Sequence, residues 1–362
     1  METLDIKETE WIKKTDASEF EDAIKRAGRI IASGGLVAFP TETVYGLGGN
    51  AFDEGASKAI YAAKGRPSDN PLIVHIYRTG DLERIARDIP DTAYLLAERF
   101  WPGPLTMILK KKENVPDTTT GGLDTVAVRF PDNETAQRLI EYSGGFVAAP
   151  SANSSGRPSP TSAKYVYEDL NGRIDMLLDD GNSVIGLEST IVDLTGDEPM
   201  ILRPGYITAD MLKETLGSVE YDPAILKAAS SKDEETGMLH PRAPGMKYRH
   251  YAPRGELLLI SGAMPDISRY MHSEINRRKE EGFSTGVILP RDMEDTFPAD
   301  SIKVTGGGSE LEQTAHDIFR FLREFDDEKT DYIYVAAVPE EGLGMAIMNR
   351  LRKAAGGRII NV

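Results

Sequence analysis

The chain has 362 residues, no cysteine and a formal net charge of −16. Its length allows two domains, and the lack of cysteine excludes disulfides, zinc fingers, iron–sulfur clusters and thiolate nucleophiles. The acidic balance disfavours tight direct binding of nucleic acid, no apolar run approaches the roughly 20 residues of a membrane span, and residues 1–14 lack the apolar core of a secretory signal. We expect a cytoplasmic protein, since a chain without cysteine fits a reducing compartment.

Helix and strand patterns alternate along the first part of the chain. Ser18 and Glu21 form a capping box that predicts the start of a helix, and Gly34 and Gly35 end it. The predicted elements that follow are a strand over 36–39, a helix over 54–63, a strand over 72–76, a helix from Asp91 that stops before Trp101, strands over 105–109 and 125–130, a helix over 134–142, and a hairpin of strands 189–194 and 200–203. The hairpin predicts a mixed sheet.

The pattern breaks after about Thr215 and resumes near residue 256. Residues 221–255 are polar and rich in proline and glycine, which is typical of a linker. The later predicted elements are strands over 256–260, 285–289 and 331–338, alternating with helices over 267–281, 311–325 and 345–355. Alternating strands and helices indicate a small doubly wound, Rossmann-like domain.

Two segments have nearly the same sequence. Residues 33–46 read SGGLVAFPTETVYG, and residues 143–156 read SGGFVAAPSANSSG. Each passes from a helix end through a short apolar strand to a proline and hydroxyl side chains. Because ligands of α/β sheets bind outside the carboxyl ends of strands, the two loops are predicted to line one polar pocket. The alternative is that similar packing needs produced similar strands.

Cations lie between the two copies. Lys64 and Arg66 belong to a proline-flanked loop that leads to a strand containing His75. Two cations on a stiff loop suit a phosphate or a carboxylate, although cations at a helix C-terminus also complement the helix dipole. A lone histidine on such a strand is more often a hydrogen-bonded core residue than a catalyst.

Arg129 and Arg203 each lie near the end of a predicted buried strand. A buried arginine needs an anion, which is either a structural carboxylate or a carboxylate of a ligand. The standard nucleotide motifs are missing: there is no P-loop, and residues 46–51 fit the G-x-G-x-x-A form without the later acidic residue that it requires. The five histidines show no metal-binding spacing.

Together, these segments resemble the YrdC-like family of threonylcarbamoyl-AMP synthases. The matching segments are 40–48, 64–75, 101–106, 149–153, 188–193 and 202–205, and segment 244–253 resembles the linker of the two-domain form. The resemblance implies a YrdC-like twisted mixed sheet with flanking helices over 16–215. It further implies a linker or lid over 216–255 and a small Rossmann-like domain over 256–362.

The resemblance also implies an activity. Members of the family condense L-threonine, bicarbonate and ATP to threonylcarbamoyl-AMP and pyrophosphate, and other proteins pass the threonylcarbamoyl group to adenosine in tRNA. Mg²⁺ is expected with ATP, its protein ligands are not visible in the sequence, and no prosthetic group is expected.

The family's functional positions match residues of this chain. Lys64 and Arg66 are the expected catalytic cations. The expected ATP contacts are Lys64, Arg66, Asn70, Thr125, Ser151, Asn153, Ser159, Arg203 and Tyr251. The expected threonine contacts are Thr43, His75, Arg129, the backbone of Ala149, and Ser189.

Two other functions were weighed against this one. A hydrogenase-maturation carbamoyltransferase also contains a YrdC-like domain, but the absence of cysteine and the chain length argue against its zinc fingers and additional domains. A non-catalytic RNA-binding module is opposed by the negative net charge.

Overall fold

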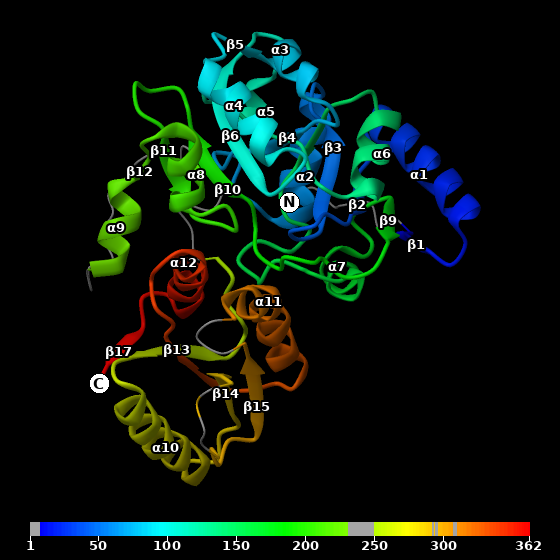
Figure 1. The fold of residues 1–362 in the computed structure, drawn as a ribbon. Helices are drawn as coiled ribbons and strands as arrows, with labels where there is room; N and C mark the ends of the chain where they lie inside the picture. Colours follow the sequence, from blue (N-terminus) through cyan, green and yellow to red (C-terminus); the bar gives the residue numbers. More distant parts are fainter. Residues whose placement is uncertain (1–7, 231–249, 292, 294–295, 307–309) are drawn as a thin grey trace.

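The computed structural model describes residues 8–230 and 250–362, apart from residues 292, 294–295 and 307–309. Two α/β units lie side by side in Figure 1, the larger built from the first part of the chain and the smaller from the last. No described helix is long and apolar enough to cross a membrane. The predicted α/β class, with a mixed sheet followed by a smaller doubly wound unit, is confirmed.

A mixed sheet forms the core of the larger unit. Its strands are β1 (Glu10–Lys13), β2 (Val37–Phe39), β3 (Gly46–Asn50), β4 (Ile73–His75), β5 (Ala86–Arg87), β6 (Leu105–Lys111), β7 (Thr125–Arg129), β8 (Val147–Ala149), β9 (Met176–Asp179), β10 (Thr190–Asp193), β11 (Met200–Arg203) and β12 (Glu220–Tyr221). Within the described residues the order is β1-β9-β2-β3-β8-β4-β7-β6-β10-β11-β12, with β5 paired to β6. The predicted hairpin is the antiparallel pair β10–β11.

Helices cover this sheet. They are α1 (Ala17–Ala32), α2 (Glu54–Lys64), α3 (Leu82–Ile85), α4 (Asp91–Phe100), α5 (Asp117–Thr120), α6 (Glu134–Tyr142), α7 (Ala163–Leu170) and α8 (Ala209–Leu216), with a 3₁₀ turn, η1 (Thr79–Asp81). The predicted capping box is wrong, because Asp16 precedes α1 and its carboxylate accepts hydrogen bonds from the backbone N–H groups of Ser18 and Glu19. An aspartate before the first turn satisfies these free N–H groups directly, and Ser18 already lies inside the helix.

The glycine-rich β3 was not predicted as a strand. A side chain at Gly48 would lie 2.7 Å from Val147 of β8 and 2.9 Å from Phe39 of β2. Glycine therefore lets the side chains of both neighbouring strands pack over β3. This strand geometry agrees with the interpretation that residues 46–51 are not a dinucleotide-binding loop.

The smaller unit is a parallel sheet between two layers of helices. Its elements are β13 (Glu256–Ser261), α10 (Met264–Glu280), β14 (Thr285–Pro290), β15 (Ser301–Thr305), α11 (Leu311–Asp327), β16 (Tyr332–Ala336), α12 (Leu343–Ala355) and β17 (Ile359–Asn361). The described strands are parallel, in the order β15-β14-β16-β13-β17. Leu257 and Leu259 of β13 face α11 and α12, while Leu258 and Ile260 face α10. This alternation is the doubly wound arrangement that the sequence predicted.

The helix layer of α11 and α12 faces the larger unit, and α10 lies on the far side (Figure 1). Val44 and Leu187 of the larger unit belong to the same buried apolar cluster as Phe319 of α11 and Leu351 of α12. The two units therefore share a hydrophobic core. Within the range expected as a linker, β12 and α9 (Pro223–Ser230) are regular elements, and residues 231–249 lie outside the described residues.

Candidate functional site

The two similar segments lie on either side of one strand. β2 and β8 both pair antiparallel with β3, so their carboxyl ends emerge at the same edge of the sheet. The backbone N–H of Leu47 donates to the carbonyl of Pro150 (2.9 Å), and that of Ala152 donates to the carbonyl of Tyr45 (2.8 Å). The structure thus brings both loops together, as the sequence repeat suggested.

Lys64 reaches the second loop from the last turn of α2. Gly65 ends this helix in the left-handed conformation, with φ of 62°. The buried Lys64 ammonium donates to the backbone carbonyl of Ser151, to that of Asn153 (2.6 Å), and to Asn153 Oδ1 (3.4 Å). Burial, and then the charge of Arg66, lowers the pKa of Lys64 well below its ordinary value. An anion bound beside Lys64 would offset this loss of hydration.

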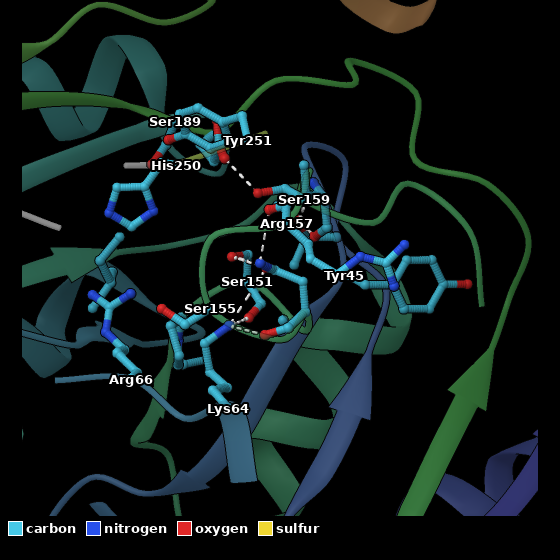
Figure 2. A pocket seen from close by; sticks show the side chains of 18 of the residues that line it. Tyr45, Lys64, Arg66, Ser151, Ser155, Arg157, Ser159, Ser189, His250 and Tyr251 are labelled. Atoms are coloured by element: carbon cyan, nitrogen blue, oxygen red, sulfur yellow. Dashed lines mark hydrogen bonds between the residues drawn. The ribbon is translucent and has the colours of Figure 1, made fainter. Parts of the chain in front are cut away.

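A cavity forms where these loops meet the end of β7 and the hairpin. Figure 2 shows Lys64 and Arg66 on one side of it and Ser189, His250 and Tyr251 on the opposite side. The predicted site residues that line the cavity are Lys64, Arg66, His75, Arg129, Ala149, Ser151, Asn153, Ser159, Ser189, Arg203 and Tyr251.

Three predicted site residues lie away from the cavity lining. Thr43 is buried beside the first loop, where its hydroxyl lies 2.8 Å from the hydroxyl of Thr41. Thr125 begins β7, at the end of that strand opposite Arg129. Asn70 is buried, and its side-chain amide has no hydrogen-bond partner among the described residues. A buried amide without partners is costly, so the Asn70 amide is suited to a contact that the protein alone does not make.

One end of the cavity contains Arg129 and His75. The Arg129 guanidinium lies 2.7 Å from a carboxylate oxygen of Glu42, and both side chains are buried. Arg129 therefore has a structural carboxylate as its ion-pair partner while it also lines the cavity. The His75 ring hydrogen-bonds the carbonyl of Ile73 (3.1 Å), as expected of a core histidine. Burial and the nearby Arg129 lower the pKa of His75 to about 3, so this ring is neutral at pH 7.

Arg203 and Ser189 form the wall beside the hairpin. The guanidinium of Arg203 donates to the carbonyl of Ser189 (3.0 Å) and to its hydroxyl oxygen (3.0 Å). That hydroxyl also lies 2.7 Å from the hydroxyl of Thr106. Burial lowers the pKa of Arg203 to about 10, which leaves the guanidinium charged at neutral pH.

Glu188 connects this wall to the smaller unit. Its Oε1 accepts a hydrogen bond from the hydroxyl of Ser159 (2.6 Å), and its Oε2 accepts one from Arg350 of α12 (3.0 Å). Both Glu188 and Ser159 line the cavity. Neither Glu188 nor Arg350 was a predicted site residue.

The smaller unit also holds the second loop. Arg323 of α11 donates to the carbonyl of Pro158 (2.6 Å) and to Asp169 of α7 (2.7 Å). Arg157, which lines the cavity, is ion-paired with both Asp169 and Asp326 of α11. The loop that contains Ser151 and Asn153 is therefore braced from behind by α11.

Tyr251 closes one side of the cavity. It has a left-handed backbone conformation, with φ of 65°, and its ring stacks on Phe319 of α11 with centroids 5.0 Å apart. The next residue, Ala252, donates its N–H to the carbonyl of Gly156 (2.9 Å). Burial raises the pKa of Tyr251 to about 12, so its hydroxyl stays protonated. Residues 251–252 are therefore attached to both units, to the smaller one through Phe319 and to the larger one through Gly156.

Sequence reasoning missed Glu42, Glu188, His250 and Arg350. The first two are single carboxylates inside otherwise buried segments, and such carboxylates need a partner. Arg350 lies close to the apolar residues Ile347 and Leu351 of an amphipathic helix. These signals indicate buried charges, but no sequence pattern indicates which charges pair, because the partners lie on distant elements.

The arrangement favours an anionic ligand. Lys64, Arg66, Arg129 and Arg203 contribute cations to one cavity, and Ser151, Ser159 and Ser189 contribute hydroxyls. Guanidinium groups match both carboxylates and phosphates. No group of three or more His, Asp or Glu side chains that would hold a metal ion is present in the described part of the chain.

Comparison with known proteins gives two matching families. Residues 29–205 match the family model described as "Telomere recombination", and residues 207–356 match "Threonylcarbamoyl-AMP synthase, C-terminal domain". The threonylcarbamoyl-AMP synthase of Pyrococcus abyssi is 48% identical over 339 residues, which cover 94% of this chain and 96% of the relative. That of Bacillus subtilis is 43% identical over 346 residues, covering 95% and 96% respectively.

A solved structure is similar along nearly the whole chain. The crystal structure of P. abyssi Sua5 complexed with L-threonine superposes with a TM-score of 0.88 at 46% identity. The match covers 98% of this chain and 99% of that one. Both units and their arrangement are therefore shared with that protein.

Proposed function

The chain belongs to the threonylcarbamoyl-AMP synthase family, and on that premise we propose that it condenses L-threonine, bicarbonate and ATP to threonylcarbamoyl-AMP and pyrophosphate. The observation that carries the proposal is that Lys64, Arg66 and Arg203 line the same cavity as Arg129. Such a cavity accommodates a phosphate chain next to an amino-acid carboxylate. The P. abyssi structure with L-threonine supports the amino acid as one substrate.

We place threonine at the end of the cavity that contains Arg129. Arg129 binds the substrate carboxylate, Ser189 and the backbone of Ala149 contact the remainder of the amino acid, and neutral His75 lies against it. For Thr43 we propose an indirect role. Its hydroxyl already contacts the hydroxyl of Thr41, so it would support the first loop.

We place ATP between the second loop and the hairpin. The expected contacts that line the cavity are Lys64, Arg66, Ser151, Asn153, Ser159, Arg203 and Tyr251. Asn70 is supported by its unpartnered amide. Thr125 is the least supported member, because it lies at the far end of β7.

The chemistry proceeds by two bond-forming steps. The threonine amine attacks the carbon of CO₂ or bicarbonate to give a carbamate, with loss of a proton and, from bicarbonate, of hydroxide. A carbamate oxygen then attacks the α-phosphorus of ATP, and the bond from that phosphorus to the bridging oxygen of pyrophosphate breaks. Negative charge builds on the phosphoryl oxygens and the leaving group, where Lys64, Arg66 and Arg203 stabilise it. Alignment of the two substrates supplies much of the remaining acceleration.

We propose that ATP binds as its Mg²⁺ complex, in which the ion would screen the phosphate charges. The donor set of the described residues does not form a protein-held metal site. Glu188 is the carboxylate in the cavity lining, and both of its oxygens already have partners. The phosphates themselves would therefore provide the main ligands for the ion.

We further propose that the product passes to tRNA threonylcarbamoyltransferase proteins in the cytoplasm. A carbamate joined to a phosphate is a reactive mixed anhydride, so the enzymes that consume it must share its compartment. For the domain organisation we retain 16–215 as the catalytic domain, 216–255 as a linker or lid and 256–362 as the C-terminal domain. The contacts of Tyr251 and Ala252 across the cavity support the lid.

Pyrophosphate release tests the proposed function. Purified protein with MgATP should release pyrophosphate at a rate that requires both L-threonine and bicarbonate, as measured by a coupled pyrophosphatase assay. L-Serine and CO₂-depleted buffer are the matched controls. Release that does not depend on threonine would contradict the proposal.

A further inference from the structure

Arg350 of α12 reaches the substrate cavity from the smaller unit without lining it. Its side chain is 1% exposed. Its Nε donates to Glu188 Oε2 (3.0 Å), and its Nη1 donates to the carbonyl of Pro204 (2.6 Å). Glu188 precedes Ser189, and Pro204 follows Arg203. Arg350 thus contacts the neighbours of two residues that line the cavity.

The two oxygens of Glu188 have different partners. Oε2 faces Arg350, and Oε1 accepts the hydroxyl of Ser159 at 2.6 Å. Glu188 therefore transmits the position of α12 to a hydroxyl in the cavity wall. Arg323 differs in this respect, because it contacts Pro158 and Asp169 behind the second loop.

Glu188 also presents an electrostatic problem. A bare carboxylate in this wall would repel the phosphates of a nucleotide, and it would compete with them for the guanidinium of Arg203. An unpaired buried charge is also costly in itself. A second cation on the side away from the ligand removes both effects.

We propose that Arg350 is a positioning residue of the substrate cavity, which neutralises and orients Glu188 from across the domain interface so that Ser159 and Arg203 face the nucleotide. The inference rests on the proposed function for the identity of that ligand as ATP. It assigns the C-terminal domain a direct part in building the ATP site. The same contact explains why α12 docks with a buried arginine where an apolar residue would otherwise complete the shared core.

The charge of Glu188 is set by groups from every element around it. Burial alone would raise the pKa of Glu188. The charges of Arg350 and Arg203 and the hydrogen bond from Ser159 lower it by more, so the pKa of Glu188 lies below its ordinary value. The other charged or titratable groups that face it are Lys353 of α12, Lys64 of α2, and His250 and Tyr251. Loss of Arg350 removes the strongest opposing charge, and we therefore expect the pKa of Glu188 to rise.

Equilibrium binding of ATP to the full-length protein tests the inference. Arg350→Met should weaken ATP binding about tenfold or more at pH 7.5, because the phosphates then meet an unpaired carboxylate. The deficit relative to wild type should shrink as the pH falls through the raised pKa of Glu188, since protonation removes the repelling charge. Arg352→Met is the matched control on the same helix, because Arg352 pairs with Glu340 and should leave ATP binding unchanged.

A second variant separates positioning from a purely structural role. The double variant Arg350→Met with Glu188→Gln has no charge to neutralise and keeps an acceptor for Ser159. It should bind ATP as Glu188→Gln alone does and show no deficit that varies with pH. A deficit in Arg350→Met that Glu188→Gln does not relieve, or one independent of pH, would overturn the inference. If Arg350→Met does not fold, the double variant compared with Glu188→Gln decides the question in the same way. Threonine-independent pyrophosphate release by the wild type would contradict the proposed function alone.

Discussion

The Lys64 ammonium makes its hydrogen bonds within the protein in the absence of substrate. Its ammonium donates to oxygens of Ser151 and Asn153, the same loop that is proposed to hold ATP. In this state the lysine organises the loop. In the proposed complex with ATP, a phosphate oxygen would replace one of these acceptors or add to them. We therefore propose two functions for Lys64, which a single substitution would remove together.

The first prediction concerns this lysine. Lys64→Ala should lower kcat on the order of 10²-fold or more, as loss of a transition-state donor does, and it should also raise KM for ATP because the loop loses its central donor. Steady-state pyrophosphate release measures both constants. Lys58→Ala on the exposed face of the same helix is the control. An unchanged rate in Lys64→Ala would reduce this lysine to a helix-end charge.

The second prediction concerns Arg129 and Glu42. Arg129→Gln should lower the free energy of unfolding by about 3–5 kcal/mol, because it leaves the buried Glu42 carboxylate without its partner. Adding Glu42→Gln should restore most of that stability without restoring the KM for threonine, which we expect to stay at least about tenfold raised through the lost carboxylate contact. Thermal unfolding and the threonine dependence of the rate measure the two effects. Recovery of the threonine KM in the double variant would show that Arg129 serves only Glu42.

At the scale of single residues, the sequence indicated which side chains belong to the site better than it indicated which charged side chains pair with each other. It predicted that the buried Arg129 needs an anion, but not that Glu42 provides one. The repeated loops and the residue types of Lys64 and Arg66 pointed to an anion site directly. Glu188 and Arg350 could not be linked from sequence, because a helix of the second domain brings them together.

At the scale of elements, the loop before Glu188 has to pass very close to α11. Gly186 has φ of 82°, and a Cβ there would lie 2.5 Å from the backbone of His316. Its N–H also donates to the carbonyl of Thr43 (3.1 Å). This glycine allows the close approach between the cavity wall and α11, the helix that braces the loop containing Ser151 and Asn153.

The third prediction follows from that distance. Gly186→Ala should destabilise the protein by roughly 1–3 kcal/mol beyond the strain of a left-handed alanine, because the methyl group displaces α11, and it should raise KM for ATP. Gly181→Ala is the control, since Gly181 has φ of 87° with open space around it and incurs only the backbone strain of about 1–2 kcal/mol. Thermal unfolding and ATP kinetics compare the two variants. Equal losses in both would show that α11 yields without consequence.

Elements with strong apolar patterns were the predictable ones. The helices α2, α4 and α6 and the hairpin β10–β11 lie within a residue or two of their predicted positions. β3 was missed because it is rich in glycine, and a glycine-rich segment taken by itself is typical of a loop. Its pairing depends on the close approach that glycine allows. β15 and β17 were missed because they are edge strands, whose pattern is weak without their neighbours.

At the scale of the whole molecule, the net charge is strongly negative, whereas the cavity is lined by cations. The net charge is −16, yet the cavity draws together Lys64, Arg66, Arg129 and Arg203. An acidic exterior repels long polyanions, while a small anion that enters the cavity meets cations at close range. The molecule is thus suited to nucleotides rather than to nucleic acids.

The fourth prediction tests this distinction. The protein should bind tRNA more weakly than about 10 μM at 0.15 M salt, because few phosphate contacts are available to release counterions. Fluorescence anisotropy with labelled tRNA at two salt concentrations measures the affinity and its salt dependence. Binding at micromolar concentration or tighter, with a steep loss of affinity in salt, would favour direct delivery to tRNA and contradict the prediction.

The position of β3 between β2 and β8 fixes one side of the candidate site. Because the two loops are joined by backbone hydrogen bonds through one shared strand, their separation is fixed, and neither can swing away without breaking the sheet. The Tyr251 wall has fewer backbone attachments: Tyr251 stacks on Phe319, and Ala252 donates one backbone hydrogen bond to Gly156. We therefore expect substrates and products to pass on the side of Tyr251, and amide exchange should be slow along β3 and faster at residues 250–253. On this view, the two loops joined through β3 would determine which ligands fit, and the Tyr251 wall would determine how quickly they bind and leave.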